Sequence, residues 1–225
     1  MNNRILFGFF AAFAGALIFA FGDLLIPQEG LYFEAADKPD EFARFVTTEN
    51  YKIWAMRGLF GVFFEMFGVL SIYLALRNSR FENLAFWGFV PFMVHVAIGF
   101  GMFSVLYFMF PALGQLHLSE ATQATHFAAM EGGLQMTFLI VGSVVWILAL
   151  ILLSIAIWKD KTTLPKWSGI VMTLGFLMIG SPGQMMQFIA NLTWGLAFLW
   201  MAIHFKKNMH KADHTIRQGQ AVTFN

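Results

Sequence analysis

Two long stretches of the chain, residues 84–111 and 134–158, contain no Asp, Glu, Lys or Arg. Each is longer than the roughly 20 apolar residues that cross a ~30 Å hydrocarbon core. Shorter apolar runs flank them on both sides. Together the runs predict an all-α, polytopic membrane bundle of six transmembrane helices, at residues 4–26, 53–76, 84–107, 134–158, 165–179 and 182–205.

The fifth of these helices has the weakest pattern, because it is short and contains Gly169, Gly175 and Gly180. The last two segments could instead form one span and a re-entrant piece. Ser181 and Pro182 suit a helix start, as a cap followed by proline at the first helical position. The first segment has an alternative interpretation as a cleaved signal peptide, with small residues around Phe21, but its apolar run is long for one.

Basic residues in alternate connections predict the orientation. The basic segments are the N-terminal tail, the second and fourth connections and the C-terminal tail, with Arg4, Arg77, Arg80, Lys159, Lys161, Lys166, Lys206, Lys207, Lys211 and Arg217. Residues 112–133 have no Lys or Arg, and residues 27–52 have three basic against six acidic residues. By the positive-inside rule both termini are cytoplasmic. Residues 1–205 then form one transmembrane domain with outer loops 27–52 and 112–133, and residues 206–225 form a polar cytoplasmic tail.

Smaller features refine this topology. Residues 40–45 and 119–130 are predicted to form short helices in the outer loops. Trp87, Trp158 and Trp167 are expected near the cytoplasmic interface and Trp54 near the outer one, as aromatic belts require.

Composition narrows the classes of function. The chain is 58% hydrophobic and 12% charged, whereas soluble domains are about 25% charged. A net charge of +1 without a basic stripe gives no reason to expect nucleic acid. The absence of cysteine excludes disulfides, thiol catalysis and thiolate metal sites. Of the histidines only His95 is expected at membrane depth, so neither haem nor another cofactor or metal is predicted.

Ionisable residues within a membrane are expensive and need a partner or a wet cavity. Asp23 and Arg57 are both predicted within ~6 Å of the outer boundary, from a rise of 1.5 Å per residue. They suit a structural ion pair between two helices. Alternatively, Arg57 presents its guanidinium group to an anionic ligand from the outer side.

Glu65 and His95 are predicted at the same mid-bilayer depth on consecutive helices. Arg57, Gly61 and Glu65 share a helix face at intervals of four, and Gly61 leaves space between the two charged groups. A Glu–His pair suits a proton relay or general acid–base catalysis, with Glu65 and His95 as catalytic residues only if the protein is an enzyme. The structural alternative is a satisfied pair that orients two helices.

Amide side chains follow one face of the last helix. Gln184, Gln187 and Asn191 lie in its outer half, and Gln135 is expected near the same level. Such amides ordinarily form hydrogen bonds between helices. The alternative is an outward-facing polar pocket that combines them with the charged groups, lined by Asp23, Arg57, Glu65, His95, Gln135, Gln187 and Asn191.

Three stretches carry a family resemblance: YKIWAMRGLFGVFFEMFGVL with the basic turn RNSRFENLAFW, then KTTLPKWSGIVMTLGFL, and the last span ending AFLWMAIHFKK. They resemble small six-helix bacterial integral membrane proteins known only as domains of unknown function. The resemblance implies a six-helix membrane bundle in a bacterial inner membrane, and it transfers no activity.

Three hypotheses of function follow. The first is a protein that binds or moves a small or lipidic ligand through the outward-facing pocket, with Asp23, Arg57, Gln135, Gln187 and Asn191 as ligand-binding residues. The second is an accessory or structural subunit with a protein partner or a second copy of itself. The third is an intramembrane enzyme that uses Glu65 and His95. Besides the lipid bilayer, a small ligand is the partner that the first hypothesis requires.

Overall fold

The computed structural model describes residues 2–25, 38–119, 136–179 and 183–222. These residues are helical apart from short turns, and no strand occurs among them. The elements are α1 (Asn2–Asp23), α2 (Pro39–Val46), α3 (Glu49–Leu76), α4 (Glu82–Ser104), the π-helical turn η1 (Val105–Met109), α5 (Phe110–Ser119), α7 (Met136–Asp160), α8 (Ser168–Ile179) and α9 (Gln184–Val222).

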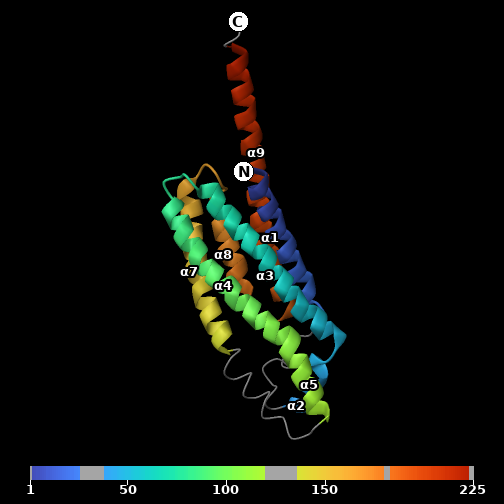
Figure 1. Ribbon diagram of the computed structural model, residues 1–225. Helices are drawn as coiled ribbons and strands as arrows, with labels where there is room; N and C mark the ends of the chain where they lie inside the picture. The colour runs from blue at the N-terminus through green and yellow to red at the C-terminus, as the bar shows by residue number, and fades with distance from the viewer. Residues whose placement is uncertain (1, 26–37, 120–135, 180–182, 223–225) are drawn as a thin grey trace.

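Six of these helices form a closed ring (Figure 1). Going round it, α1 packs on α3, α3 on α4, α4 on α7, α7 on α8, α8 on α9, and α9 returns to α1. Small residues allow the helices to approach closely, as is usual in membranes. A Cβ at Gly15 would lie 2.8 Å from the Cβ of Phe64, so only glycine fits at this crossing of α1 and α3.

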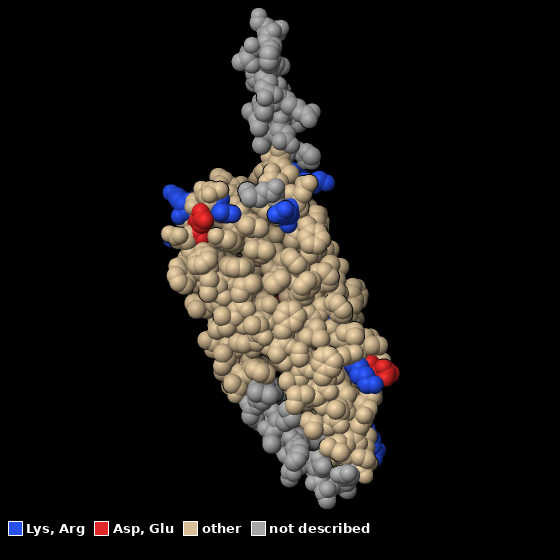
Figure 2. Space-filling model, in the orientation of Figure 1, with Lys and Arg blue, Asp and Glu red and all other residues tan. Residues whose placement is uncertain are grey.

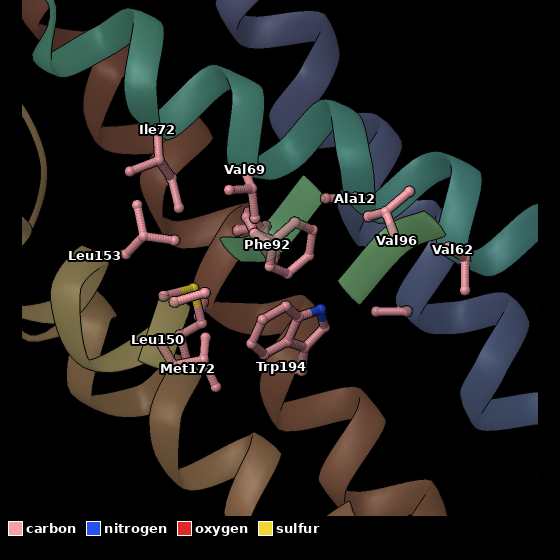
Figure 3. Close-up of a cluster of buried hydrophobic side chains, with 14 of the residues drawn as sticks. Ala12, Val62, Val69, Ile72, Phe92, Val96, Leu150, Leu153, Met172 and Trp194 are labelled. Carbon is pink, nitrogen blue, oxygen red and sulfur yellow. The ribbon is translucent and has the colours of Figure 1, made fainter. Parts of the chain in front are cut away.

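The centre of the ring is filled on one level by large apolar side chains. Phe92 and Trp194 meet there between α3, α4, α7 and α9 (Figure 3), and both are fully buried. Leu153 and Met172 close the same cluster from α7 and α8.

The number of long apolar helices is five among the described residues. They are Asn2–Asp23, Glu49–Leu76, Glu82–Ser119, Thr137–Asp160 and Gln184–Met209, each long and apolar enough to cross a membrane. Helices of this length and composition are typical of a membrane protein. The predicted fifth helix is present as α8 but has only 12 residues, which is about 18 Å. The predicted start of the sixth helix at Ser181 and Pro182 lies outside the described residues.

Two predicted helix ends are wrong. The third predicted helix does not stop at Tyr107, because η1 accommodates an extra residue and α5 continues the helix to Ser119. The last helix does not stop at Phe205 but continues to Val222 and extends beyond the bundle (Figure 1). The predicted helix at 119–130 lies outside the described residues, apart from Ser119, which ends α5.

The predicted short helix at 40–45 is confirmed as α2. Pro39 occupies its first turn, and Asp40 and Glu41 follow there, as suits a helix N-terminus. The helix packs on α5 through Phe42 and Phe110, whose ring centroids are 5.7 Å apart. His117 of α5 lies 2.7 Å from Asp40, which joins the two helices into a layer beyond the α1 end at Asp23.

A wide belt of the visible surface has no Lys, Arg, Asp or Glu side chains (Figure 2). Lys and Arg gather at one end, which we call the basic end. It is the end at which α1 and α8 begin, α3 and α7 end and α9 leaves the bundle (Figure 1), and these segments carry Arg4, Arg77, Arg80, Lys159, Lys161, Lys166, Lys206 and Lys207. Trp87, Trp158 and Trp167 are exposed toward this end. Trp54, predicted for the opposite belt, is instead buried in the bundle with 8% of its surface exposed.

Candidate functional site

A cavity of about 320 Å³ lies inside the ring, and each of the six ring helices lines it. Its wall is mostly aromatic and aliphatic, with Phe19, Phe103, Phe138, Trp146 and Phe176 among the lining side chains. Polar groups enter it at two levels. One is a charged cluster at the Asp23 end of α1, and the other is formed by Glu65 and His95 farther along the bundle.

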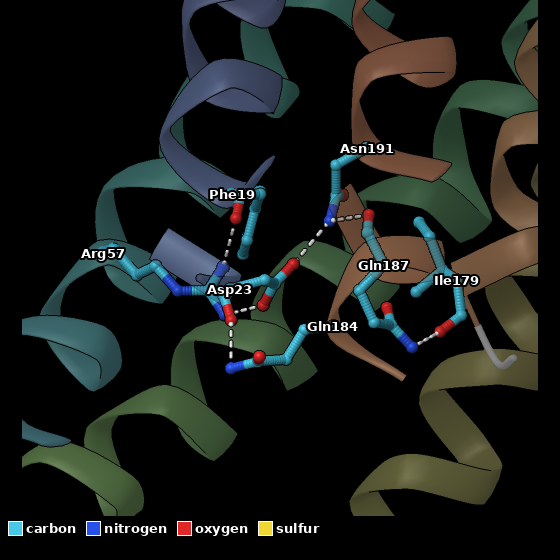
Figure 4. Close-up of polar contacts among 7 residues, drawn as sticks. All are labelled: Phe19, Asp23, Arg57, Ile179, Gln184, Gln187 and Asn191. Atoms are coloured by element: carbon cyan, nitrogen blue, oxygen red, sulfur yellow. Dashed lines mark hydrogen bonds and ion pairs between the residues drawn. The ribbon is translucent and has the colours of Figure 1, made fainter. Parts of the chain in front are cut away.

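The charged cluster is held together by Asp23 (Figure 4). Its carboxylate forms an ion pair with the guanidinium of Arg57 and accepts a hydrogen bond of 2.8 Å from Asn191 Nδ2. Arg57 also donates to the carbonyl oxygen of Phe19 at 3.0 Å. All three polar side chains are buried, so this network joins α1, α3 and α9 inside the bundle.

Arg57 is confined by its neighbours as well as by its ion pair. Its guanidinium carbon lies 5.3 Å from the ring centroid of Phe19 and 5.2 Å from that of Trp54, both within cation–π range. Gly22 lets α1 pass this side chain, because a Cβ there would lie 1.8 Å from Arg57 Cδ. Arg57 thus forms the ion pair between two helices that the structural alternative predicted, and it also lines the cavity.

The amides of α9 bond across helices in the way that such residues ordinarily do. Gln184 donates to the carbonyl oxygen of Asp23 at 3.4 Å, and Gln187 donates to the carbonyl oxygen of Ile179 at the end of α8. Asn191 donates to Asp23, as described above, and also to the carbonyl oxygen of Gln187 at 3.1 Å. These bonds fix the start of α9 against α1 and α8.

Glu65 lies on the cavity wall in a different environment. Only 3% of its surface is exposed, and it has no cationic partner among the described residues. The indole of Trp194 interacts with it, but Trp194 Nε1 makes no hydrogen bond of ordinary geometry. A carboxyl group in such a place is costly unless it is neutral or acquires a partner.

His95 faces the same cavity from α4. Its Nδ1 lies 3.1 Å from the carbonyl oxygen of Gly142 in α7, which can only accept, so Nδ1 carries the proton in this bond. The ring stacks on Trp146 with centroids 4.3 Å apart and planes inclined by 24°. In the neutral tautomer that this bond selects, Nε2 is left as an acceptor.

Comparison with known proteins identifies the family. The model of a family of unknown function, DUF6796, matches residues 1–212. The chain belongs to this family. No curated protein and no solved structure matches it. The resemblance to a domain of unknown function is thus confirmed, and the DUF6796 match covers the ring helices, with α9 covered as far as residue 212.

In this DUF6796 member, most of the residues predicted to form the pocket lie around the same cavity. Six of the seven predicted pocket residues line the one cavity: Asp23, Arg57, Glu65, His95, Gln187 and Asn191. Gln135 lies outside the described residues. Their roles as ligand-binding or catalytic residues stay predictions.

Two details of the prediction are wrong. Glu65 and His95 share a cavity but form no hydrogen bond or ion pair with each other, because His95 is turned to the backbone of α7. The space beside Gly61 is not open either. The ring of Phe19 occupies it, and a Cβ at Gly61 would lie 2.2 Å from Phe19 Cε2.

Sequence reasoning missed the aromatic wall. Trp146 lies in the middle of α7, far from either end of the span, where a belt residue would not be expected. Its Nε1 is buried and makes no hydrogen bond. The presence of a tryptophan in the middle of an apolar run could have indicated this wall, since the N–H group of a buried tryptophan needs a hydrogen-bond partner.

Proposed function

We propose that this protein binds a small, mostly apolar ligand that carries a hydrogen-bond donor, and holds it in the cavity with the donor on Glu65. The observation that carries the proposal is a buried carboxyl group on the wall of an aromatic cavity, which forms no ion pair with any described residue. A hydroxyl or ammonium group of a ligand would satisfy it.

The size and lining of the cavity support this class of ligand. Ligand sites are usually concave, about 300–1,000 Å³ in volume, and mostly apolar with a few polar groups that fix orientation. A volume of about 320 Å³ suits a small molecule, and it is less than the volume of a whole phospholipid. The aromatic rings of Trp146 and Phe176, whose centroids are 4.3 Å apart, supply a rigid apolar surface.

The polar group of the ligand is assigned to Glu65 because the charged cluster is already satisfied. Asp23 bonds to both Arg57 and Asn191, and Gln187 bonds to α8. Opening that network for a ligand would leave buried charges unpaired. By contrast, Trp146 Nε1 makes no hydrogen bond, and the Glu65 carboxyl interacts only with the indole of Trp194 among the described residues.

We further propose six membrane crossings with both termini on the cytoplasmic side of a bacterial inner membrane. Supporting this, α1 begins and α9 leaves the bundle at the basic end (Figure 1), and Asn208 of α9 donates to Thr162 there at 3.1 Å. α8 leads away from the basic end, and α9 starts beside Asp23. A helix of about 18 Å completes a crossing only where the bilayer thins or the adjoining residues contribute.

The test is native mass spectrometry of protein extracted in mild detergent, with Glu65→Gln as the variant and Glu49→Gln as its control. Glu49 is on the same helix with 79% of its side chain exposed. We expect a bound small-molecule mass on the wild type and the control. Occupancy should fall about tenfold or more in Glu65→Gln, since a hydrogen bond to a charged group contributes about 1.5–3 kcal/mol.

A wild-type protein without any bound mass, or a mass that Glu65→Gln leaves unchanged, would overturn the proposal. Arg57→Met provides a second comparison. It should lower thermal stability without changing the identity of the bound mass.

An accessory subunit is the second candidate, and one observation favours it. Asp23 bonds to both Arg57 and Asn191, so these buried polar groups hold α1, α3 and α9 together without a ligand. An apo protein that co-purifies with a fixed partner in stoichiometric amount would support this candidate over ligand binding.

A further inference from the structure

A second hollow lies at the basic end, separate from the bundle cavity. It is an open groove of about 510 Å³ between the α3–α4 connection and the end of α7. Arg80 and Phe81 form one side, and Trp158, Lys159 and Lys161 form the other. Three cationic side chains therefore share one groove that two aromatic rings line.

These cations have no acidic partner among the described residues. The nearest acids in sequence are occupied by the backbones of their own turns. Glu82 accepts a hydrogen bond of 2.8 Å from the backbone N–H of Asn78, and Asp160 accepts one of 2.6 Å from the backbone N–H of Thr163. The three cations of the groove are thus free of ion pairs within the described residues, because both neighbouring carboxylates are turned to backbone N–H groups.

The two turns that build the groove are sharply bent. Asn78 and Lys161 both have positive φ, 69° and 61°, a conformation that ends each helix abruptly. Arg80 lies against the ring of Phe81, with its guanidinium carbon 4.6 Å from the centroid. This contact restrains one of the three cations on the groove wall.

We propose that this groove binds the phosphodiester headgroup of an anionic phospholipid. Its position favours a lipid over a soluble anion. Trp158 on the groove wall packs against Trp167 with centroids 4.8 Å apart, and Lys166 lies 5.4 Å from each ring. Trp87, which follows Phe81 in the first part of α4, is also exposed. Tryptophans occupy the headgroup level, and basic pockets between helices at that level bind anionic headgroups.

The experiment measures lipid adducts by native mass spectrometry in detergent, with phosphatidylglycerol, phosphatidylcholine and inorganic phosphate added separately and together. The variant replaces the three groove cations: Arg80→Gln, Lys159→Gln and Lys161→Gln. The control removes one arginine and two lysines elsewhere at the basic end: Arg4→Gln, Lys206→Gln and Lys207→Gln. All six side chains are exposed, so both triple variants are expected to fold.

We expect phosphatidylglycerol to bind the wild type and the control alike, and phosphatidylcholine to bind more weakly. Each groove cation should raise the affinity for phosphatidylglycerol about fivefold. This ratio corresponds to about 1 kcal/mol for a basic residue near a membrane surface. The groove variant should therefore lose at least about tenfold in adduct. A single Lys161→Gln variant should give an intermediate loss.

Three results would overturn the proposal. Equal losses in the two triple variants would mean that only the total charge attracts the lipid. Equal binding of phosphatidylcholine would exclude recognition of the anionic headgroup. Displacement of phosphatidylglycerol by millimolar inorganic phosphate would assign the groove to a soluble anion. None of these outcomes depends on the cavity ligand, so the two proposals fail separately.

Discussion

Replacing one partner of the ion pair between Asp23 and Arg57 should lower the stability of the protein strongly. Replacing both partners in a double variant should lower it less. In Arg57→Met the Asp23 carboxylate loses its ion pair while it remains 4% exposed. Removing one partner of a buried pair costs about 3–5 kcal/mol, because the other charge is left buried. The hydrogen bond to Phe19 and the contacts with two aromatic rings disappear as well.

The converse variant, Asp23→Asn, leaves the guanidinium without a counter-charge and should cost a similar amount. In the double variant no buried charge remains, and the amide oxygen introduced by Asp23→Asn can still accept from Asn191. Replacing a buried pair by neutral groups is often close to neutral. The double variant should therefore be more stable than either single variant.

The assay is thermal unfolding in detergent, followed by intrinsic tryptophan fluorescence. For a chain of this size 1 kcal/mol corresponds to about 2–4 °C, so each single variant should melt about 6–20 °C lower. Lys52→Met is the control. It removes one partner of the exposed pair with Glu49, whose N–O distance is 2.7 Å and whose side chains are 32% and 79% exposed. Such pairs contribute about 0–1 kcal/mol.

The reasoning is refuted if the double variant loses as much stability as the two single variants added together. It is also refuted if Lys52→Met lowers the melting temperature as much as Arg57→Met. Either result would mean that burial of the pair does not determine its energetic weight.

Three further variants, the first with a matched control, test contacts between helices. Gly175→Ala puts a Cβ 2.7 Å from the backbone of α9 and should cost about 1–3 kcal/mol in thermal unfolding, whereas Gly101→Ala, with its nearest neighbour at 3.7 Å, should be neutral. Ser154→Ala removes a hydrogen bond of 2.9 Å from α7 to the α8 backbone and should cost about 0.6 kcal/mol and no more than about 1.7. Asp40→Ala removes the contact with His117 and should speed amide exchange in α2 while leaving α3 protected. Unchanged exchange in α2 would mean that its packing on α5 suffices.

The sequence predicted the helices themselves because hydrocarbon imposes a simple rule on them. A run of about 20 apolar residues in hydrocarbon must satisfy its backbone N–H and C=O groups by hydrogen bonds within the run, which only a helix allows. The position of each helix therefore follows from composition alone. Only the helix ends depend on local detail. The π turn at Val105 carried α4 onward into α5, and no hydrophobic pattern reports such a turn.

The sequence also predicted which polar residues share a depth, since depth follows from counting residues along a helix. Asp23 and Arg57 were placed near the outer boundary in this way, Glu65 and His95 were placed at mid-bilayer, and all four line one cavity. Counting could not decide the partners of each group, because partners depend on the rotation of neighbouring helices about their axes.

The tertiary structure alone decided those rotations. It turned His95 toward the backbone of α7 instead of toward Glu65, placed the ring of Phe19 beside Gly61, and aimed Trp146 into the cavity. The reason is physical. Inside a membrane, an apolar helix surface is about equally stable against lipid and against another helix. Close packing at small residues and a few hydrogen bonds therefore determine how helices face one another. The sequence thus determined the depth of each polar group, and packing determined which of them meet.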